Sequence, residues 1–496
     1  MNLVFFHIMI PALLCRIVRS CYMKRNMCTP VNRKSVILGL ETSCDDTGCA
    51  IVDNCGNILG EALHSQLQVH LNNGGIIPPI ARDLHKQHIE RVVEEAVASA
   101  NLGLGDVDAI ATTVKPGMPL SLLVGMNHGK HLARTWGKPF IPIHHMEAHA
   151  LTIRMVAQVE FPFLVLLISG GHCLLAVAQG VHQFLLLGQS LDDAPGEAFD
   201  KVTWLIPAET VCLTLWAPED QFKVHPLIPA TLDHVVNINR RATGLTERAG
   251  KCQGVFNWSA KMIARRLKLH NLPEFGGLSG GAAIQLAATR GDPLSFQFPF
   301  MLSSYRDCNF SMAGLKNKAR LHIVRQEHEH GIEGDGIIPG VYDLCASMQW
   351  AITSHLCQRL QRAMEFISMR DMLPLDRRTL VVSGGVACNS FITGVLGVVC
   401  EEYGYSLAVP PPKLCTDNGV MIAWNGVEKW RTGVGAVRDL DAVDIEPATY
   451  RLVTVTIAQV LFVVVRCPLG VDRREDVVSA NIKCNWIKPR TLLRMR

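Results

Sequence analysis

The hydrophobic pattern becomes regular at Val36, where the apolar run VILGL precedes the polar stretch ETSCDDTG. A second apolar run, CAIVD, follows it, and the turn-forming residues NCGN lead to a third run, ILGEAL. Short apolar runs separated by Gly, Asn and Asp are typical of strands joined by tight turns. Residues 36–63 are therefore predicted to form three consecutive strands.

A similar arrangement recurs further along the chain. It is found in FLVLLISGGHCLLAVAQG, residues 163–180, and a third apolar run ends in glycines in TLVVSGGVACN, residues 379–389. Between these runs lie helical patterns such as residues 81–103, whose apolar positions recur every three or four residues and which are predicted to end on a glycine. The recurrence indicates two related halves, and the alternation of strands and helices predicts an α/β architecture.

Two stretches show neither the strand pattern nor the helical pattern of apolar residues. Residues from about 203 to 260 carry scattered Trp, Pro and Asn without a regular apolar pattern, and we interpret them as an insertion. Residues 452–465, LVTVTIAQVLFVVV, form an apolar run of fourteen, which is too short for a helix to span a bilayer. This run is predicted to be a strand or an exposed segment prone to aggregation. We therefore do not expect a membrane protein.

Composition narrows the class of protein. The chain has 496 residues, of which 48% are hydrophobic and 19% charged, as in a globular protein with two or more lobes. A net charge of +4 is too small to establish a nucleic-acid partner, because such binding needs basic residues clustered on one surface. The 17 cysteines contain no C-x-x-C pair and are interpreted as mostly reduced thiols in an intracellular protein.

The first forty residues contain no Asp or Glu, and their basic residues alternate with apolar ones. This charge pattern is typical of a mitochondrial transit peptide. A secretory signal is the alternative, since MNLVFFHIMIPALLC is apolar, but no positive charge precedes it and no small-x-small cleavage site follows. We expect mitochondrial localisation, with residues 1–35 as a disordered transit peptide.

The stretch HHMEAHA, residues 144–150, places two histidines four residues apart. In a helix, His145 and His149 would lie one turn apart on the same face, within reach of one divalent ion. A chain with 19 histidines also contains such pairs by chance. Asp417 would complete a set of two histidines and one carboxylate, and the alternative role for this residue is a helix N-cap.

Glycine pairs end several of the apolar runs. Backbone N–H groups in such turns can bind an anion, and the absence of Cβ lets a ligand approach closely. Ser169-Gly170-Gly171, Ser279-Gly280-Gly281 and Ser383-Gly384-Gly385 all have this form, which favours a ligand that carries phosphate over ordinary turns. Asp200, in DDAPGEAFDK, is a candidate partner of a ribose hydroxyl or a solvated capping carboxylate.

Eight motifs occur in an order that resembles the tRNA threonylcarbamoyl-adenosine transferase family. They are GLETSCDDTG, TVKPGMPLSLLVG, HHMEAH, LISGGH, GEAFDK, FSMAGLK, SGGVACN and CTDNGVMIAWNG. Lys115, where bacterial members usually have Gly, makes the chain most similar to the mitochondrial branch. The resemblance covers roughly residues 36–202 and 262–448, with a short return near CPLGVD.

The resemblance implies a two-lobed, duplicated fold of the actin, sugar-kinase and Hsp70 type, similar to ribonuclease H, with the ligand between the lobes. It implies that one divalent ion (Fe, Zn or Mg) is bound by His145, His149 and Asp417. Threonylcarbamoyl-adenylate would be lined by Leu167, Ile168, Ser169, Gly170 and Gly171, with Asp200 and Gly281 at its ribose and Asn389 at its adenine. No residue stands out as the general base.

The implied reaction moves the threonylcarbamoyl group from that adenylate to N6 of the adenosine 3′ of the anticodon, in tRNAs that read codons beginning with A. The partners expected are therefore tRNA and the adenylate, and a homodimer is expected from the resemblance. Three alternatives stay open: a catalytically impaired scaffold of the same fold, a small-molecule kinase, and a metalloprotease. In a protease of the H-E-x-x-H type the glutamate directly follows the first histidine, whereas Glu147 is two residues on.

The expected lobes follow from the same motifs. We predict an N-terminal lobe at 36–150, a second lobe at 151–410 containing the insertion, a return to the first lobe at 411–448, and an atypical C-terminal tail at 449–496.

Overall fold

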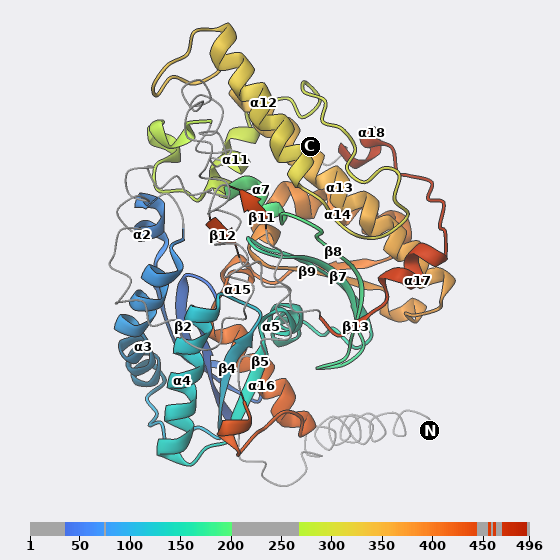
Figure 1. Ribbon diagram of the computed structural model, residues 1–496. Coiled ribbons are helices and arrows are strands. Elements are labelled where there is room, and N and C mark those ends of the chain that lie inside the picture. Colours follow the sequence, from blue (N-terminus) through green and yellow to red (C-terminus); the bar gives the residue numbers. More distant parts are fainter. Residues whose placement is uncertain are drawn as a thin grey trace, which may run out of the picture.

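The computed structural model describes residues 35–73, 76–200, 267–443, 455–457, 460–462 and 469–493 (Figure 1). The predicted transit peptide and the predicted insertion at about 203–260 lie outside these residues. Two large sheets, each covered by helices, form the molecule, which confirms the predicted α/β class with two lobes.

The first sheet has the strand order β3-β2-β1-β4-β5. Strand β2 pairs antiparallel with both β1 and β3, whereas β4 and β5 run parallel to β1. The three consecutive strands predicted from Val36 onward are confirmed. The bounds are β1 (Val36–Glu41), β2 (Asp46–Asp53), β3 (Ile58–Ser65), β4 (Ala109–Lys115) and β5 (Phe140–His144).

Strand β1 is buried on both faces, which explains its continuous apolar run. Leu38 and Leu40 pack in a cluster with Val92 of α3 (Pro78–Ala100), and α4 (Pro119–Trp136) covers the same face next to α3. The short helix α2 (Leu67–Asn72) precedes α3. Ile37 points the other way and packs in a cluster with Val420 of α16 (Gly419–Thr432). Successive residues of a strand face opposite sides, so one run supplies two cores.

Helix α3 ends three residues before the glycine at which it was predicted to end. Asn101 adopts the left-handed conformation (φ 51°) and its N–H bonds back to the carbonyl of Ala98. Asparagine tolerates this conformation better than most residues with a Cβ, and it therefore ends the helix here in place of Gly103.

The second sheet repeats the first. Its order is β10-β9-β6-β7-β8-β13, with β6, β7 and β8 antiparallel and β9 and β10 parallel to β6. This is the arrangement of the first sheet with β13 added beside β8, so the prediction of two related halves is confirmed. The strands are β6 (Phe163–Ile168), β7 (Cys173–Ala178), β8 (Phe184–Gln189), β9 (Thr379–Ser383), β10 (Ser406–Ala408) and β13 (Val471–Asp472).

Helices and short 3₁₀ turns enclose one face of this second sheet (Figure 1). The helices are α7 (Pro195–Asp200), α11 (Gly280–Ala288), α12 (Ala313–Glu329), α13 (Val341–Met369), α14 (Ser390–Tyr403), α17 (Arg474–Ser479) and α18 (Pro489–Leu492). The 3₁₀ turns in both lobes are η3 (Leu269–Asn271), η4 (Pro273–Phe275), η5 (Leu375–Arg377), η6 (Gly385–Cys388) and η7 (Leu440–Ala442).

Helix α5 (His145–Leu151), followed by α6 (Ile153–Val156), lies between the two sheets. Met146 and Ala150 pack in a core cluster with β6 of the second sheet, whereas Ala148 packs in a cluster with α16 and the first sheet. The short helix therefore belongs to both lobes, which places its two histidines at their junction.

The C-terminal segments add small elements. Within the predicted apolar run at 452–465, β11 (Val455–Ile457) and β12 (Val460–Phe462) pair as antiparallel strands, which agrees with the strand alternative; the other residues of the run lie outside the described ones. In the part of the chain that the structure describes, no helix combines the length and the apolar character needed to cross a membrane.

Candidate metal centre

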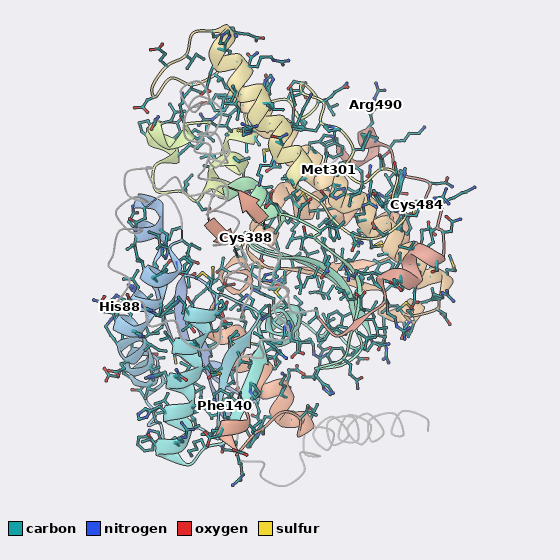
Figure 2. All side chains as sticks on the ribbon, in the orientation of Figure 1. His88, Phe140, Met301, Cys388, Cys484 and Arg490 are labelled. Carbon is teal, nitrogen blue, oxygen red and sulfur yellow. The ribbon has the colours of Figure 1, made fainter. Side chains whose placement is uncertain are left out.

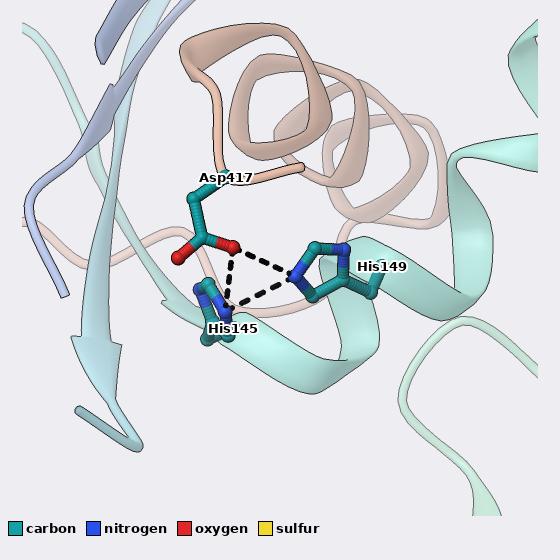
Figure 3. Close-up of side chains that lie close together, drawn as sticks. All are labelled: His145, His149 and Asp417. Carbon is teal, nitrogen blue, oxygen red and sulfur yellow. Dashed lines mark hydrogen bonds and ion pairs between the residues drawn. The ribbon is translucent and has the colours of Figure 1, made fainter. Parts of the chain in front are cut away.

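Helix α5 brings His145 and His149 together as predicted (Figure 3). Their Nε2 atoms are 3.1 Å apart, and both rings are buried. His144 caps the helix, because its Nδ1 accepts a hydrogen bond from the N–H of Met146 at 3.2 Å. The apolar side chains of α5 are held in the two cores, so the histidine pair is fixed on the remaining face.

Asp417 reaches the same point from the segment between α15 (Pro412–Cys415) and α16. Its Oδ1 lies 3.1 Å from Nε2 of His149 and 3.4 Å from Nε2 of His145. The alternative role of Asp417 as a helix N-cap is wrong: Asn418 caps α16, with its Oδ1 accepting from the N–H of Met421 at 2.9 Å. Because the neighbour takes the capping role, Asp417 can turn its carboxylate toward the histidines.

The three donor atoms have the spacing that one small divalent ion requires. All three lie within 4.8 Å of one another. Ligand atoms at about 2.0–2.1 Å from an ion would be about 2.8–3.4 Å apart, at the lower end in octahedral and at the upper end in tetrahedral geometry. The observed separations of 3.1–3.4 Å fall in this range. Two imidazole nitrogens and a carboxylate suit Zn²⁺ or Fe²⁺. The residues present therefore fit the ion that the resemblance implies.

Glu41, which the sequence analysis did not single out, is the strongest addition to the site. It ends β1, is fully buried, and its Oε2 lies 3.3 Å from Nδ1 of His145. The N–H of Ser43 donates to its Oε1 at 2.6 Å, and the hydroxyl of Thr113 donates to its Oε2 at 2.5 Å. A carboxylate that accepts the Nδ1 proton leaves Nε2 of His145 free to bind an ion. The available sequence signal was an acidic residue directly after a buried strand.

The charges of this cluster hold one another in place. Burial alone would lower the pKa of His145, but the carboxylates of Asp417 and Glu41 outweigh it and raise the pKa to about 10. Burial would likewise raise the pKa of Asp417, and the charge and hydrogen bond of His145 instead keep this pKa well below its usual value. Burial lowers the pKa of His149, which favours its neutral form. Without an ion, His145 thus carries a proton between two carboxylates.

Glu147 takes no part in this cluster. Its Oε2 is 2.9 Å from Nζ of Lys429 in α16, on another side of α5 from the histidine pair. The glutamate of a metalloprotease must reach a water on the metal, and this ion pair holds Glu147 elsewhere. The arrangement disfavours the metalloprotease alternative.

The turn between β6 and β7 lies at the carboxyl end of β6. Leu167 and Ile168 are fully buried in the cores, so only their main chain could meet a ligand. Ser169 closes the turn: its N–H donates to the carbonyl of His172 at 2.9 Å and its hydroxyl accepts from the N–H of His172 at 3.1 Å. Gly170 and Gly171 are exposed, and a Cβ on either would meet nothing within 4 Å among the described atoms. The turn therefore has room for a ligand against its main chain.

Asp200 and Gly281 lie on neighbouring helices. Asp200 is the last residue of α7, and its side chain lies outside what the structure describes. Gly281 is in the first turn of α11, which packs against α7 and is capped by Ser279. The two predicted ribose residues are thus carried by helices in contact, although residues 201–266 between them are not described.

Asn389 is buried and already largely engaged. Its Oδ1 accepts from the N–H groups of Phe391 and Ile392 and so caps α14, and its Nδ2 donates to Oε1 of Gln349 at 2.8 Å. One N–H of the amide is left for a ligand, so a contact with adenine would use that single donor.

Comparison with known proteins adds an independent finding. The model of the tRNA N6-adenosine threonylcarbamoyltransferase family matches residues 57–226 and 248–424. The gap at 227–247 lies inside the predicted insertion. The mitochondrial tRNA N6-adenosine threonylcarbamoyltransferase of Homo sapiens is 42% identical over 453 residues, which cover 91% of this chain and 90% of that protein. A probable mitochondrial enzyme of the same name from Drosophila melanogaster is 39% identical over 464 residues, which cover 92% of this chain and 94% of that protein.

A bacterial relative is also similar. The tRNA N6-adenosine threonylcarbamoyltransferase of Rhodospirillum rubrum is 35% identical over 416 residues, 83% of this chain and 92% of that protein. Among solved structures, T.kodakarensis HypF aligns with 83% of this chain and 50% of that chain at 15% identity, with a TM-score of 0.43.

Proposed function

This chain belongs to the tRNA N6-adenosine threonylcarbamoyltransferase family, and from that premise we propose that it transfers threonylcarbamoyl from its adenylate to N6 of an adenosine in mitochondrial tRNA. The acceptor is the adenosine 3′ of the anticodon in tRNAs that read codons beginning with A. The chain is thus a transferase of tRNA modification, localised to the mitochondrion like the relatives with that name.

One observation carries the assignment of the reacting centre: the convergence of His145, His149 and Asp417 at the junction of the lobes. We propose that these residues bind one divalent ion, with Fe, Zn and Mg as the candidates. When bound, such an ion polarises the carbonyl under attack or fixes the threonyl end of the donor.

The chain's own residues then orient the two substrates. The N6 amine is a poor nucleophile, and holding it next to the carbamoyl carbon provides much of the rate. We propose that the turn Ser169-Gly170-Gly171 binds the donor through its main chain, because its glycines are exposed and open, and backbone N–H groups in such a turn stabilise an anion. Asp200 and Gly281 are proposed at the ribose, and the free donor of Asn389 at the adenine. The main chain of Leu167 and Ile168 completes this surface.

Glu41 is proposed as a positioning residue in this scheme. Its contact with Nδ1 of His145 selects the tautomer whose Nε2 faces Asp417. Helix α5 packs against both sheets, and this packing fixes its two histidines relative to the turn Ser169-Gly170-Gly171 after β6.

The test is transfer of labelled threonylcarbamoyl from its adenylate to a tRNA transcript that reads an A-starting codon. We expect product with the parent chain and a loss of at least about a hundredfold with His145→Ala, since a missing ligand leaves the ion incompletely held. His182→Ala, at an exposed position, is the matched control and should keep activity. Equal product from His145→Ala and the parent would refute the proposed centre, and no product from a folded parent that binds metal would favour the impaired scaffold.

The metal and the oligomeric state are measured separately. Elemental analysis of the purified protein should find one divalent ion per chain, and none after His145→Ala. The homodimer expected from the resemblance is proposed as well, and sedimentation equilibrium that finds a monomer at micromolar concentration would refute it.

A further inference from the structure

Two cysteines from separate motifs meet beside the proposed centre. Cys388 ends the 3₁₀ turn η6, one residue before Asn389, and Cys415 ends α15, two residues before Asp417. These two short elements pack against each other. Cys388 lies in the middle of the molecule (Figure 2), is partly exposed, and is therefore reachable by small molecules, whereas Cys415 is buried.

The two thiols are neighbours, because the elements that they end pack against each other and each thiol shifts the pKa of the other. Each sulfur also contacts a carbonyl oxygen. Sγ of Cys388 is 3.7 Å from the carbonyl of Pro412, which begins α15, and Sγ of Cys415 is 3.2 Å from the carbonyl of Pro410. All cysteines among the described residues are free thiols, so no other bond competes for this pair there.

We propose that Cys388 and Cys415 are a thiol–disulfide site that a peroxide oxidises, and that the resulting bond weakens metal binding by His145, His149 and Asp417. The second half of this inference rests on the proposed function. It predicts a site that reports oxidative conditions at the junction of the lobes.

The chemistry balances with one peroxide. The Cys388 sulfur attacks one peroxide oxygen, the O–O bond breaks, and one water leaves with a sulfenic acid on Cys388. The Cys415 sulfur then attacks that sulfur, the S–O bond breaks and a second water leaves. Two thiols are oxidised by two electrons and one hydrogen peroxide is reduced to two waters. The neighbouring Cys415 side chain lowers the pKa of Cys388 to about 7, which supports Cys388 as the attacking thiolate.

Closing the bond affects Asp417 through the chain. A disulfide holds its sulfurs about 2.05 Å apart, closer than two unbonded thiols can lie, so η6 and α15 must approach each other. Only Thr416 separates Cys415 from Asp417, and the carboxylate sits 3.1 Å from His149 before the bond forms. A shift of this ligand spoils the geometry of the three donors, for which losses of about tenfold or more in metal affinity are usual.

Peptide mapping tests the bond directly. The full chain is treated with hydrogen peroxide, remaining thiols are alkylated, and the digest is examined by mass spectrometry without reductant. We expect a linked pair of peptides containing Cys388 and Cys415, which dithiothreitol separates. Cys388→Ser should abolish this pair, while the exposed-site control Cys55→Ser should retain it. If Cys388→Ser does not fold, the test is the presence or absence of the linked peptides in the parent chain alone. Absence of the linked pair at peroxide levels that oxidise Cys55 would overturn the inference.

Zinc binding tests the consequence. Titration of zinc ion against a competing chelator should give an affinity about tenfold weaker for the oxidised than for the reduced chain. Equal affinities would overturn the coupling between the disulfide and the metal centre. Failure of the reduced chain to bind zinc or another divalent ion would overturn the coupling together with the proposed function. The disulfide itself is detected by mass, so that result does not depend on metal binding.

Discussion

At the residue scale, His145 links two carboxylates that come from different parts of the chain. Its Nδ1 faces Glu41 of β1 and its Nε2 faces Asp417 before α16. The first contact sets the tautomer and the second completes the donor set. The ring is buried, so water cannot replace either partner at low cost. A change of the residue at position 41 should therefore affect metal binding, although Glu41 is not itself one of the proposed ligands.

We predict that Glu41→Gln weakens metal binding by about 10–100-fold, because an amide accepts the Nδ1 proton less well than a carboxylate and leaves His145 poorly oriented. Zinc titration of the variant against a chelator measures this loss. Glu94→Gln, at an exposed position of α3, is the control with the same chemical change and should bind zinc like the parent. The Ser43 hydroxyl also lies 3.2 Å from Nδ1 of His145, so an unchanged affinity for Glu41→Gln would show that Ser43 alone can orient the ring.

Metal binding is also predicted to release a proton. Below pH 10, His145 carries a proton in the absence of an ion because Asp417 and Glu41 raise its pKa to about 10 despite burial. The ion needs the unprotonated Nε2, so it displaces that proton, and affinity should rise with pH by up to about tenfold per unit between pH 7 and 9. Calorimetry in two buffers of different ionisation enthalpy should give different apparent binding heats. Identical heats would mean that no proton leaves.

At the element scale, α16 is held by backbone approaching backbone. A Cβ on Gly39 of β1 would lie 2.2 Å from the N of Ala423, and one on Gly419 would lie 2.4 Å from the carbonyl carbon of Cys49. Main-chain atoms cannot swing aside as the end of a long side chain can. Glycine at these positions lets α16 lie directly against β1 and β2, which carries Asp417 to the histidines.

Gly39→Ala is predicted to push α16 away from the sheet and to lower the free energy of unfolding by about 1–3 kcal/mol. Urea denaturation followed by circular dichroism measures this change. The control is Gly105→Ala, where the added methyl would meet only Trp136 at 3.5 Å, and the midpoint should stay nearly unchanged. A parent-like midpoint for Gly39→Ala would contradict the close packing of helix and sheet.

At the scale of the whole molecule, the described part of the C-terminal tail is an addition to the second sheet. Residues Val471 and Asp472 pair with β8 as a sixth strand, and α17 packs beside it. Val477 of α17 is fully buried, while Val478 is 50% exposed. The segment that looked atypical in sequence thus covers an edge of the sheet, which would otherwise expose unpaired backbone groups.

Neighbouring valines test this role. Val477→Ala should lower the free energy of unfolding by about 1–3 kcal/mol, since it removes buried methyl groups and leaves a cavity. Val478→Ala makes the same chemical change on the solvent side and should shift stability by less than about 0.5 kcal/mol. Thermal and urea unfolding of both variants give the comparison. Equal behaviour of the two would mean that α17 is not docked on the second lobe.

Local signals in the sequence predicted the elements better than their ends. Apolar runs with turn residues predicted β1 to β3, the repeat of the pattern predicted two related halves, and the i,i+4 spacing predicted that His145 and His149 share a face of a helix. The end of α3 was misplaced because Gly103 and Asn101 both suit a left-handed cap, and only the chain's path after Ala100 selects between them.

Local signals did not predict the contacts between residues far apart in the chain. Asp417 was named through family resemblance, and Glu41 was not named at all, because its only local signal is an acid at the end of a buried strand. His149 and Asp417 are 268 residues apart, and His145 and Glu41 are 104 apart. Side-chain periodicity extends only along one element, so the sequence determined the elements and their faces. The stacking of two sheets on α5 decided which faces meet, since that depends on how the cores pack together.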